Sequence, residues 1–191
     1  MRKIIFDCET ANTFAEAGSS ESADLDLSVV CIYDSETNQY SSYFQEELKE
    51  LWPILEKADL LIGFNSDHFD IPLLNKYYSG DLSKLKSLDL LKEVKNSLGR
   101  RIKLDTIAEA TLGINKSGHG LEAVTWWKQG EKEKVKKYCL DDVKITKEIY
   151  EYALKNEILK YKDAGIIKDI KLDTSKWHEK PDSVITHTLF G

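Results

Sequence analysis

The chain has 191 residues, 41% of them hydrophobic, and a formal net charge of −6. This size and composition allow one buried core and do not require a second domain. No run approaches the roughly 18 consecutive apolar residues that a membrane-spanning helix needs, so we expect a soluble, cytoplasmic protein with no membrane contact.

The first predicted element is a strand over residues 2–9. On a strand, alternate side chains point to opposite faces, so Ile5, Asp7 and Glu9 share one face. Residues 10–26 are small and polar and contain turn formers, which predicts a mobile loop directly after this strand. Residues 27–33 and 39–44 then read as two strands joined by a turn, which predicts a hairpin.

The middle of the chain predicts alternating helices and strands. Residues 46–58 carry apolar side chains at helical spacing, and residues 60–65 form the continuous apolar run of a strand buried on both faces. The remaining predicted elements are a helix from residue 68 or 69 to 78, a strand over 85–90, and helices over 91–98, 105–112, 121–127 and 131–159. We find no repeat or low-complexity tract.

Helix geometry distinguishes two adjacent acids in the long last helix. Tyr138 and Asp142 are four residues apart and therefore share a face of the helix. Asp141 points about 100° away from Asp142 around the helix axis. Apolar side chains border the face of Asp142, so we expect Asp142 to point inward and Asp141 outward. A buried carboxylate without a counter-ion costs several kcal/mol, which favours a bound cation near Asp142.

The three cysteines, Cys8, Cys31 and Cys139, show neither paired spacing nor a Cys/His metal pattern. We expect reduced, buried packing residues, with no disulfide and no zinc site.

Three short strings each place a carboxylate beside an apolar anchor: Phe6-Asp7-Cys8-Glu9-Thr10, Asn65-Ser66-Asp67-His68-Phe69-Asp70 and Tyr138-Cys139-Leu140-Asp141-Asp142. Their order and spacing resemble the three motifs of the DEDD superfamily of 3′→5′ exonucleases. The match is to the tyrosine branch, which includes the exonuclease domain of family B DNA polymerases and stand-alone relatives. The resemblance covers roughly residues 2–155.

The resemblance implies an α/β, ribonuclease-H-like fold with a mixed five-stranded sheet flanked by helices. We expect an exonuclease domain over residues 1–160 and a C-terminal extension of unknown role over residues 161–191.

The resemblance also implies the site. The expected metal ligands are Asp7, Glu9, Asp70 and Asp142, which would hold two divalent ions, Mg²⁺ or Mn²⁺. Tyr138 would orient the nucleophilic water or bind the scissile phosphate. Thr10, Phe14 and Asn65 are expected to contact the substrate, Phe14 by stacking on terminal bases. Alternative interpretations are that Asp7 and Glu9 form a solvated pair, that Asp70 is only a helix-terminal acid, and that Phe14 anchors a loop.

The implied function is metal-dependent 3′→5′ cleavage of single-stranded or frayed DNA or RNA 3′ ends, releasing nucleoside monophosphates. Two alternatives stay open: a catalytically silent nucleic-acid-binding module of the same fold, and a structure-specific endonuclease. A proofreading or repair role would require a polymerase, helicase or repair partner.

The net negative charge disfavours a nucleic-acid partner, because phosphates are bound through Lys and Arg. Two basic clusters weaken this objection, since either could form a positive rim around an acidic pocket. Alternatively, they are solvated helix faces offset by acids such as Glu131 and Glu133. The clusters are Lys92, Lys95, Arg100, Arg101 and Lys103, and Lys128, Lys132, Lys134, Lys136 and Lys137.

Overall fold

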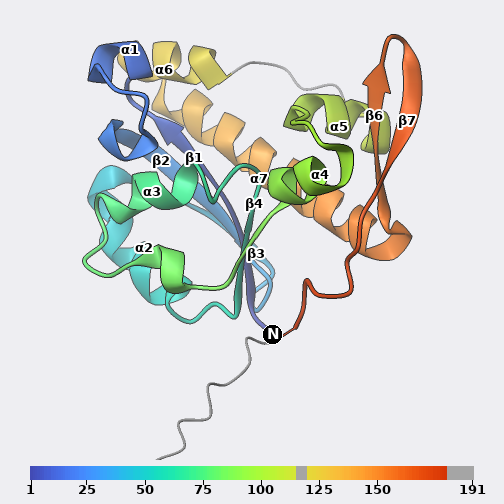
Figure 1. The fold of residues 1–191 in the computed structure, drawn as a ribbon. Helices are drawn as coiled ribbons and strands as arrows, with labels where there is room; N and C mark the ends of the chain where they lie inside the picture. Colours follow the sequence, from blue (N-terminus) through green and yellow to red (C-terminus); the bar gives the residue numbers. More distant parts are fainter. Residues whose placement is uncertain (115–119, 180–191) are drawn as a thin grey trace, which may run out of the picture.

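A mixed five-stranded sheet runs through the middle of the computed structural model, which describes residues 1–114 and 120–179 (Figure 1). The strand order is β3-β2-β1-β4-β5. Strand β1 pairs antiparallel with β2 and parallel with β4, so it occupies the centre of the sheet. The strands are β1 (Lys3–Thr10), β2 (Leu27–Asp34), β3 (Gln39–Phe44), β4 (Leu60–Gly63) and β5 (Ser87–Asp89). The predicted sheet and hairpin are therefore confirmed.

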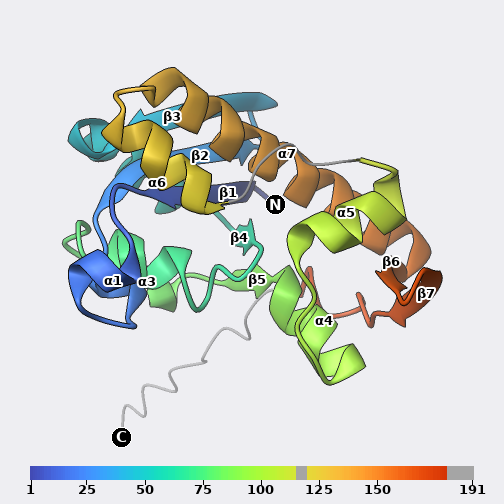
Figure 2. The same cartoon turned by 90° about the horizontal axis from the view of Figure 1, so that it is seen from above.

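Helices cover both faces of this sheet (Figure 2). They are α1 (Phe14–Ala17), α2 (Leu48–Leu55), α3 (Asp70–Asn75), α4 (Leu90–Leu98), α5 (Leu104–Leu112), α6 (Gly120–Lys128) and α7 (Lys132–Asn156). Helices α2 and α3 pack against one face with Ile4 and Phe6 of β1. Helices α4 to α7 pack against the other with Ile5 of β1. The alternation predicted for β1 is confirmed, and it directs Asp7 and Glu9 towards the α7 side.

Residues 10–26, predicted as a mobile loop, contain two short helical elements that the sequence analysis missed: α1 and a 3-10 turn, η1 (Ser22–Asp24). Thr13 caps α1 by accepting a hydrogen bond from the Glu16 amide, and the Glu16 carboxylate accepts one from the Thr13 amide, which is a capping box. Leu25 is buried and ties the end of the segment to the α2–α3 core. The Thr-x-x-Glu spacing was the sequence signal for this helix.

A second, two-stranded sheet follows α7, formed by β6 (Ile158–Asp163) and β7 (Ile166–Lys171). This hairpin includes residue 160, where the sequence places a domain boundary, and its Leu159, Tyr161 and Ile170 belong to the same apolar core as α7. Beyond it, Trp177 stacks on Tyr150 of α7 with ring centroids 5.9 Å apart. Residues 180–191 of the expected extension lie outside the described residues.

Among the described residues, no helix is both long and apolar enough to span a bilayer. The three cysteines are free and buried, as predicted.

Candidate active site

The first two carboxylates lie at the end of the central strand. Glu9 is buried and Asp7 is partly exposed. Both lie on the face of β1 that α7 covers, and the thiol of Cys139 on α7 donates to the Asp7 carbonyl oxygen at 3.2 Å. This contact fixes the helix against the strand at the point where the acids emerge.

Helix α7 supplies the third carboxylate. Asp142 is only 5% exposed, whereas Asp141 is partly exposed and pairs with Lys144 at 2.9 Å. The predicted inward and outward directions of these neighbours are confirmed. A second ion pair on α7 joins Lys147 to Glu151, one helical turn apart.

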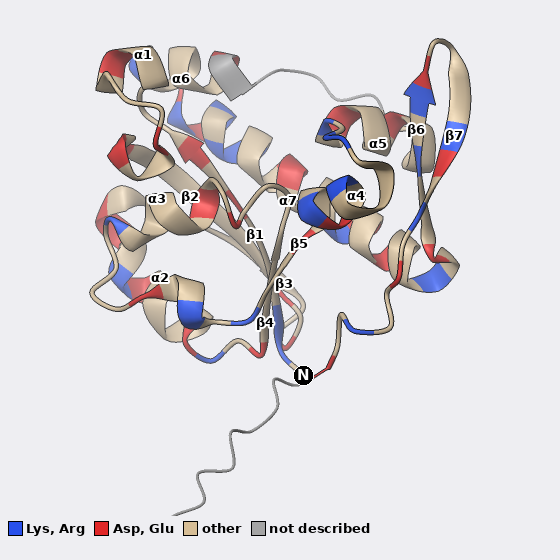
Figure 3. Cartoon of the chain, viewed as in Figure 1, with Lys and Arg blue, Asp and Glu red and all other residues tan. Residues whose placement is uncertain are grey.

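Asp7, Glu9 and Asp142 converge, because each offers a carboxylate oxygen within 4.8 Å of the others. Three clustered carboxylates repel one another, whereas hard divalent cations such as Mg²⁺ and Mn²⁺ prefer oxygen ligands. The donor set present therefore fits a divalent cation. Figure 3 shows acidic ribbon at the end of β1 and on the neighbouring stretch of α7.

Asp70 lines the same pocket but stands outside this group of three. It is 3% exposed, and its Oδ1 accepts a hydrogen bond from the Cys8 amide at 2.8 Å. Burial raises the pKa of Asp70 to about 7, against the opposing effect of that hydrogen bond. The backbone of β1 thus holds Asp70 beside the strand residues that carry the other acids.

A tight turn after β4 delivers Asp70 to this position. Gly63 permits it, because a Cβ there would lie 2.4 Å from the Ser66 Cβ. Asn65 follows with a left-handed φ of 69°, and its carbonyl accepts the Phe69 amide at 3.0 Å. Phe69, just before Asp70, is partly buried: it packs against the α2–α3 core, lines the pocket and meets Phe14 edge-to-face.

All eight residues predicted for the site line one pocket of about 440 Å³. They are Asp7, Glu9, Thr10, Phe14, Asn65, Asp70, Tyr138 and Asp142. Thr10 is buried and its hydroxyl donates to the Asn12 carbonyl at 2.9 Å. Phe14 is 40% exposed, so its ring is accessible from the pocket and from solvent.

Sequence reasoning missed the contact that orients Tyr138. The ring of Trp126 on α6 packs edge-on against Tyr138 with centroids 5.8 Å apart, and the Lys134 ammonium lies 4.3 Å from the Trp126 ring centroid. Tyr138 is 8% exposed. The sequence shows Trp126 in the helix predicted before the Tyr138 motif, but it does not show which residue that ring contacts.

Most of the basic residues in the two clusters have acidic partners. Lys128 pairs with Glu16, Lys132 with Glu46, Lys134 with Glu131, Lys136 with Glu133, Lys92 with Asp67 and Arg100 with Asp163. The interpretation as helix faces offset by Glu131 and Glu133 therefore holds for Lys134 and Lys136, and the other four are compensated by acids on other elements. Arg101 differs, because its guanidinium donates to the Asn65 side-chain oxygen at 2.5 Å, beside the pocket.

Comparison with known proteins agrees with this architecture. A family model described as RNase_H superfamily matches residues 4–154. The chain therefore belongs to the RNase_H superfamily, and the predicted ribonuclease-H-like fold is confirmed.

Among solved structures, the chain resembles the family B DNA polymerase from the hyperthermophilic archaeon Pyrobaculum calidifontis, with a TM-score of 0.62 and 18% sequence identity. The match covers 81% of this chain but only 24% of the polymerase chain. At this identity the likeness concerns the fold. No curated protein matches the chain significantly.

Proposed function

We propose that the protein is a metal-dependent 3′→5′ exonuclease of the tyrosine branch of the DEDD superfamily, acting on single-stranded or frayed nucleic-acid ends. The observation that carries the proposal is the convergence of Asp7, Glu9 and Asp142 within 4.8 Å, in a pocket that also holds Tyr138 and Asp70. The likeness to a DNA polymerase and the superfamily assignment support a nuclease.

The acids would hold two divalent cations, Mg²⁺ or Mn²⁺. Asp7, Glu9 and Asp142 supply the clustered oxygens, and Asp70, which lines the same pocket beside β1, is the fourth candidate ligand. Such ions, when bound, lower the pKa of water and stabilise charge on a leaving oxygen. The carboxylates would orient the ions, and Glu9 and Asp142 are buried, so strand and helix packing limits their movement.

Tyr138 would position the attacking water or the scissile phosphate through its hydroxyl. The edge-on contact with Trp126 restricts the ring for that purpose.

The pocket would receive the terminal nucleotide. Its volume of about 440 Å³ lies within the range of small-ligand sites. Phe14, partly exposed and braced edge-on by Phe69, offers a face on which a base can stack. Thr10 and Asn65 place polar groups on the same wall.

Timed digestion of 5′-labelled DNA and RNA oligonucleotides, with and without Mg²⁺ or Mn²⁺, tests this proposal. We expect products that shorten from the 3′ end, and resistance when that end is blocked. Cleavage of circular single strands would instead identify an endonuclease, and strand binding without any cleavage would identify a silent binding module.

A further inference from the structure

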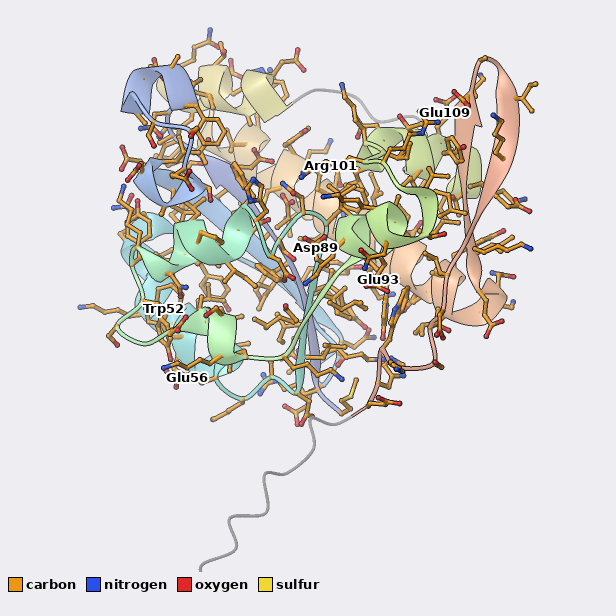
Figure 4. The ribbon with its side chains drawn as sticks, in the orientation of Figure 1. Trp52, Glu56, Asp89, Glu93, Arg101 and Glu109 are labelled. Atoms are coloured by element: carbon orange, nitrogen blue, oxygen red, sulfur yellow. The ribbon has the colours of Figure 1, made fainter. Side chains whose placement is uncertain are left out.

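A second cavity of about 370 Å³ adjoins the catalytic pocket. Asn65 lines both cavities, so they are neighbours across one side chain. The second cavity lies between the turn after β4 and helix α4, and we call it the α4 pocket; Lys92, Lys95, Arg101 and Asp89 are among its lining residues. Figure 4 shows Arg101 and Asp89 near each other, beside α4.

The acids of the α4 pocket are compensated within the protein. Asp89 is 5% exposed, and its Oδ1 accepts the amides of Asn65, Leu91 and Lys92 at 2.8, 2.9 and 3.3 Å. Its Oδ2 accepts the Asp67 amide at 3.2 Å. Asp67 accepts the Ser87 hydroxyl at 2.6 Å and pairs with Lys92 at 3.0 Å.

Two cations of the α4 pocket are not compensated in this way. Within residues 1–114 and 120–179, neither Lys95 nor Arg101 forms a salt bridge; Arg101 instead holds the neutral Asn65 amide oxygen. Both side chains are exposed. The α4 pocket therefore presents net positive charge directly beside a pocket that is acidic, although the whole chain is negative.

We propose that the α4 pocket binds the phosphates of the strand immediately upstream of the scissile bond. An anion fits the exposed ammonium of Lys95 and the fork of Arg101. Among the described residues, the lining includes His68 but no Phe, Tyr or Trp, so its exposed cations favour phosphates over a run of stacked bases. The substrate is then an extended single strand, and a compound that fills only the catalytic pocket is a poor one.

Arg101 connects the two cavities. Its contact with Asn65 means that a phosphate drawn to the guanidinium lies next to a side chain of the catalytic pocket. Occupation of the α4 pocket therefore places the strand end against the acids.

The kinetic test compares two substrates. The p-nitrophenyl ester of thymidine 5′-monophosphate occupies only the catalytic pocket, whereas a single-stranded oligonucleotide also reaches the α4 pocket. In Lys95→Glu we expect the ratio of kcat/KM for the oligonucleotide to kcat/KM for the ester to fall by about tenfold. Lys49→Glu, an exposed lysine on α2 against the opposite sheet face, makes the same charge change and should keep the wild-type ratio.

The kinetic test depends on the proposed exonuclease function, so a binding test is needed that does not. Fluorescence anisotropy of a labelled oligonucleotide in EDTA measures strand binding without cleavage. The plot of log affinity against log salt should be shallower in Lys95→Glu than in Lys49→Glu, by about 0.7 for each phosphate that the variant no longer neutralises. Equal slopes and equal substrate ratios in the two variants would overturn the inference. A slope change in a protein that hydrolyses neither substrate would support the α4 pocket and refute the exonuclease.

Discussion

Replacing Asp142 by Asn should remove the stabilisation that a divalent metal gives this protein. Three carboxylates within 4.8 Å repel one another by about 3 kcal/mol per pair at an effective dielectric constant near 20, before the solvent exposure of Asp7 is considered. A cation that binds only the folded state relieves this repulsion. At 100 times its dissociation constant it stabilises the fold by about 2.7 kcal/mol.

For a domain of this size, that free energy corresponds to a rise in Tm of about 5–10 °C. Thermal unfolding of the wild type in EDTA and in millimolar Mn²⁺ or Mg²⁺ should show it. Asp142→Asn removes one of three converging ligands and should lose most of the increase. Asp141→Asn is the matched control, because its carboxylate is partly exposed and pairs with Lys144.

The reasoning would be refuted by an equal metal-dependent Tm increase in Asp142→Asn and wild type. A loss confined to Asp141→Asn would show that the register of α7 is misplaced. An unchanged melting curve in the wild type would exclude a preformed site.

Three further predictions concern single side chains of the pocket. Tyr138→Phe keeps the ring that packs on Trp126 but loses the hydroxyl, so cleavage should slow by about 10²-fold while the metal-dependent Tm increase remains; a wild-type rate would make Tyr138 purely structural. Phe14→Ala should raise KM for oligonucleotides by the equivalent of about 1–3 kcal/mol per stacked base, and no change would make Phe14 only a loop anchor. In metal-free protein, burial raises the pKa of Asp70 to about 7 in the folded state, whereas the unfolded value is near 3.9. The free energy of unfolding should therefore fall as the pH rises between these two values. Urea unfolding in EDTA should show this fall in wild type and not in Asp70→Asn; parallel curves would contradict it.

The sequence predicted the architecture well where periodicity is regular. The alternation in β1 placed Asp7 and Glu9 on one face, and the helical spacing in α7 chose Asp142 over Asp141. Both inferences depend only on local backbone geometry, which the sequence pattern reports directly.

The sequence pattern does not predict contacts between segments that are far apart in the chain. The Asp89 carboxylate joins the turn after β4 to the start of α4, and Arg101 reaches Asn65 across 36 positions of the chain. Trp126 meets Tyr138 only because α6 folds back beside α7. Such pairs depend on tertiary packing, so the isolated motifs could not reveal them.

Short elements are also hard to predict, because their signals span only a few residues. The small, polar composition of residues 10–26 predicts a loop, and a single capping box does not outweigh it, so the sequence does not reveal helix α1. The pattern after β4 predicts a helix that extends to residue 78, whereas α3 ends at Asn75.

Release of the terminal nucleotide is the most direct test of the central claim, that the three converging acids form a nuclease site. A single-stranded oligonucleotide labelled on its last nucleotide is incubated with Mg²⁺ and wild-type protein, Asp142→Asn or Asp141→Asn. We predict that wild type and Asp141→Asn release the label as a nucleoside monophosphate at similar rates, and that Asp142→Asn releases essentially none. Equal release by all three proteins, or release of labelled fragments longer than one nucleotide, would contradict the account.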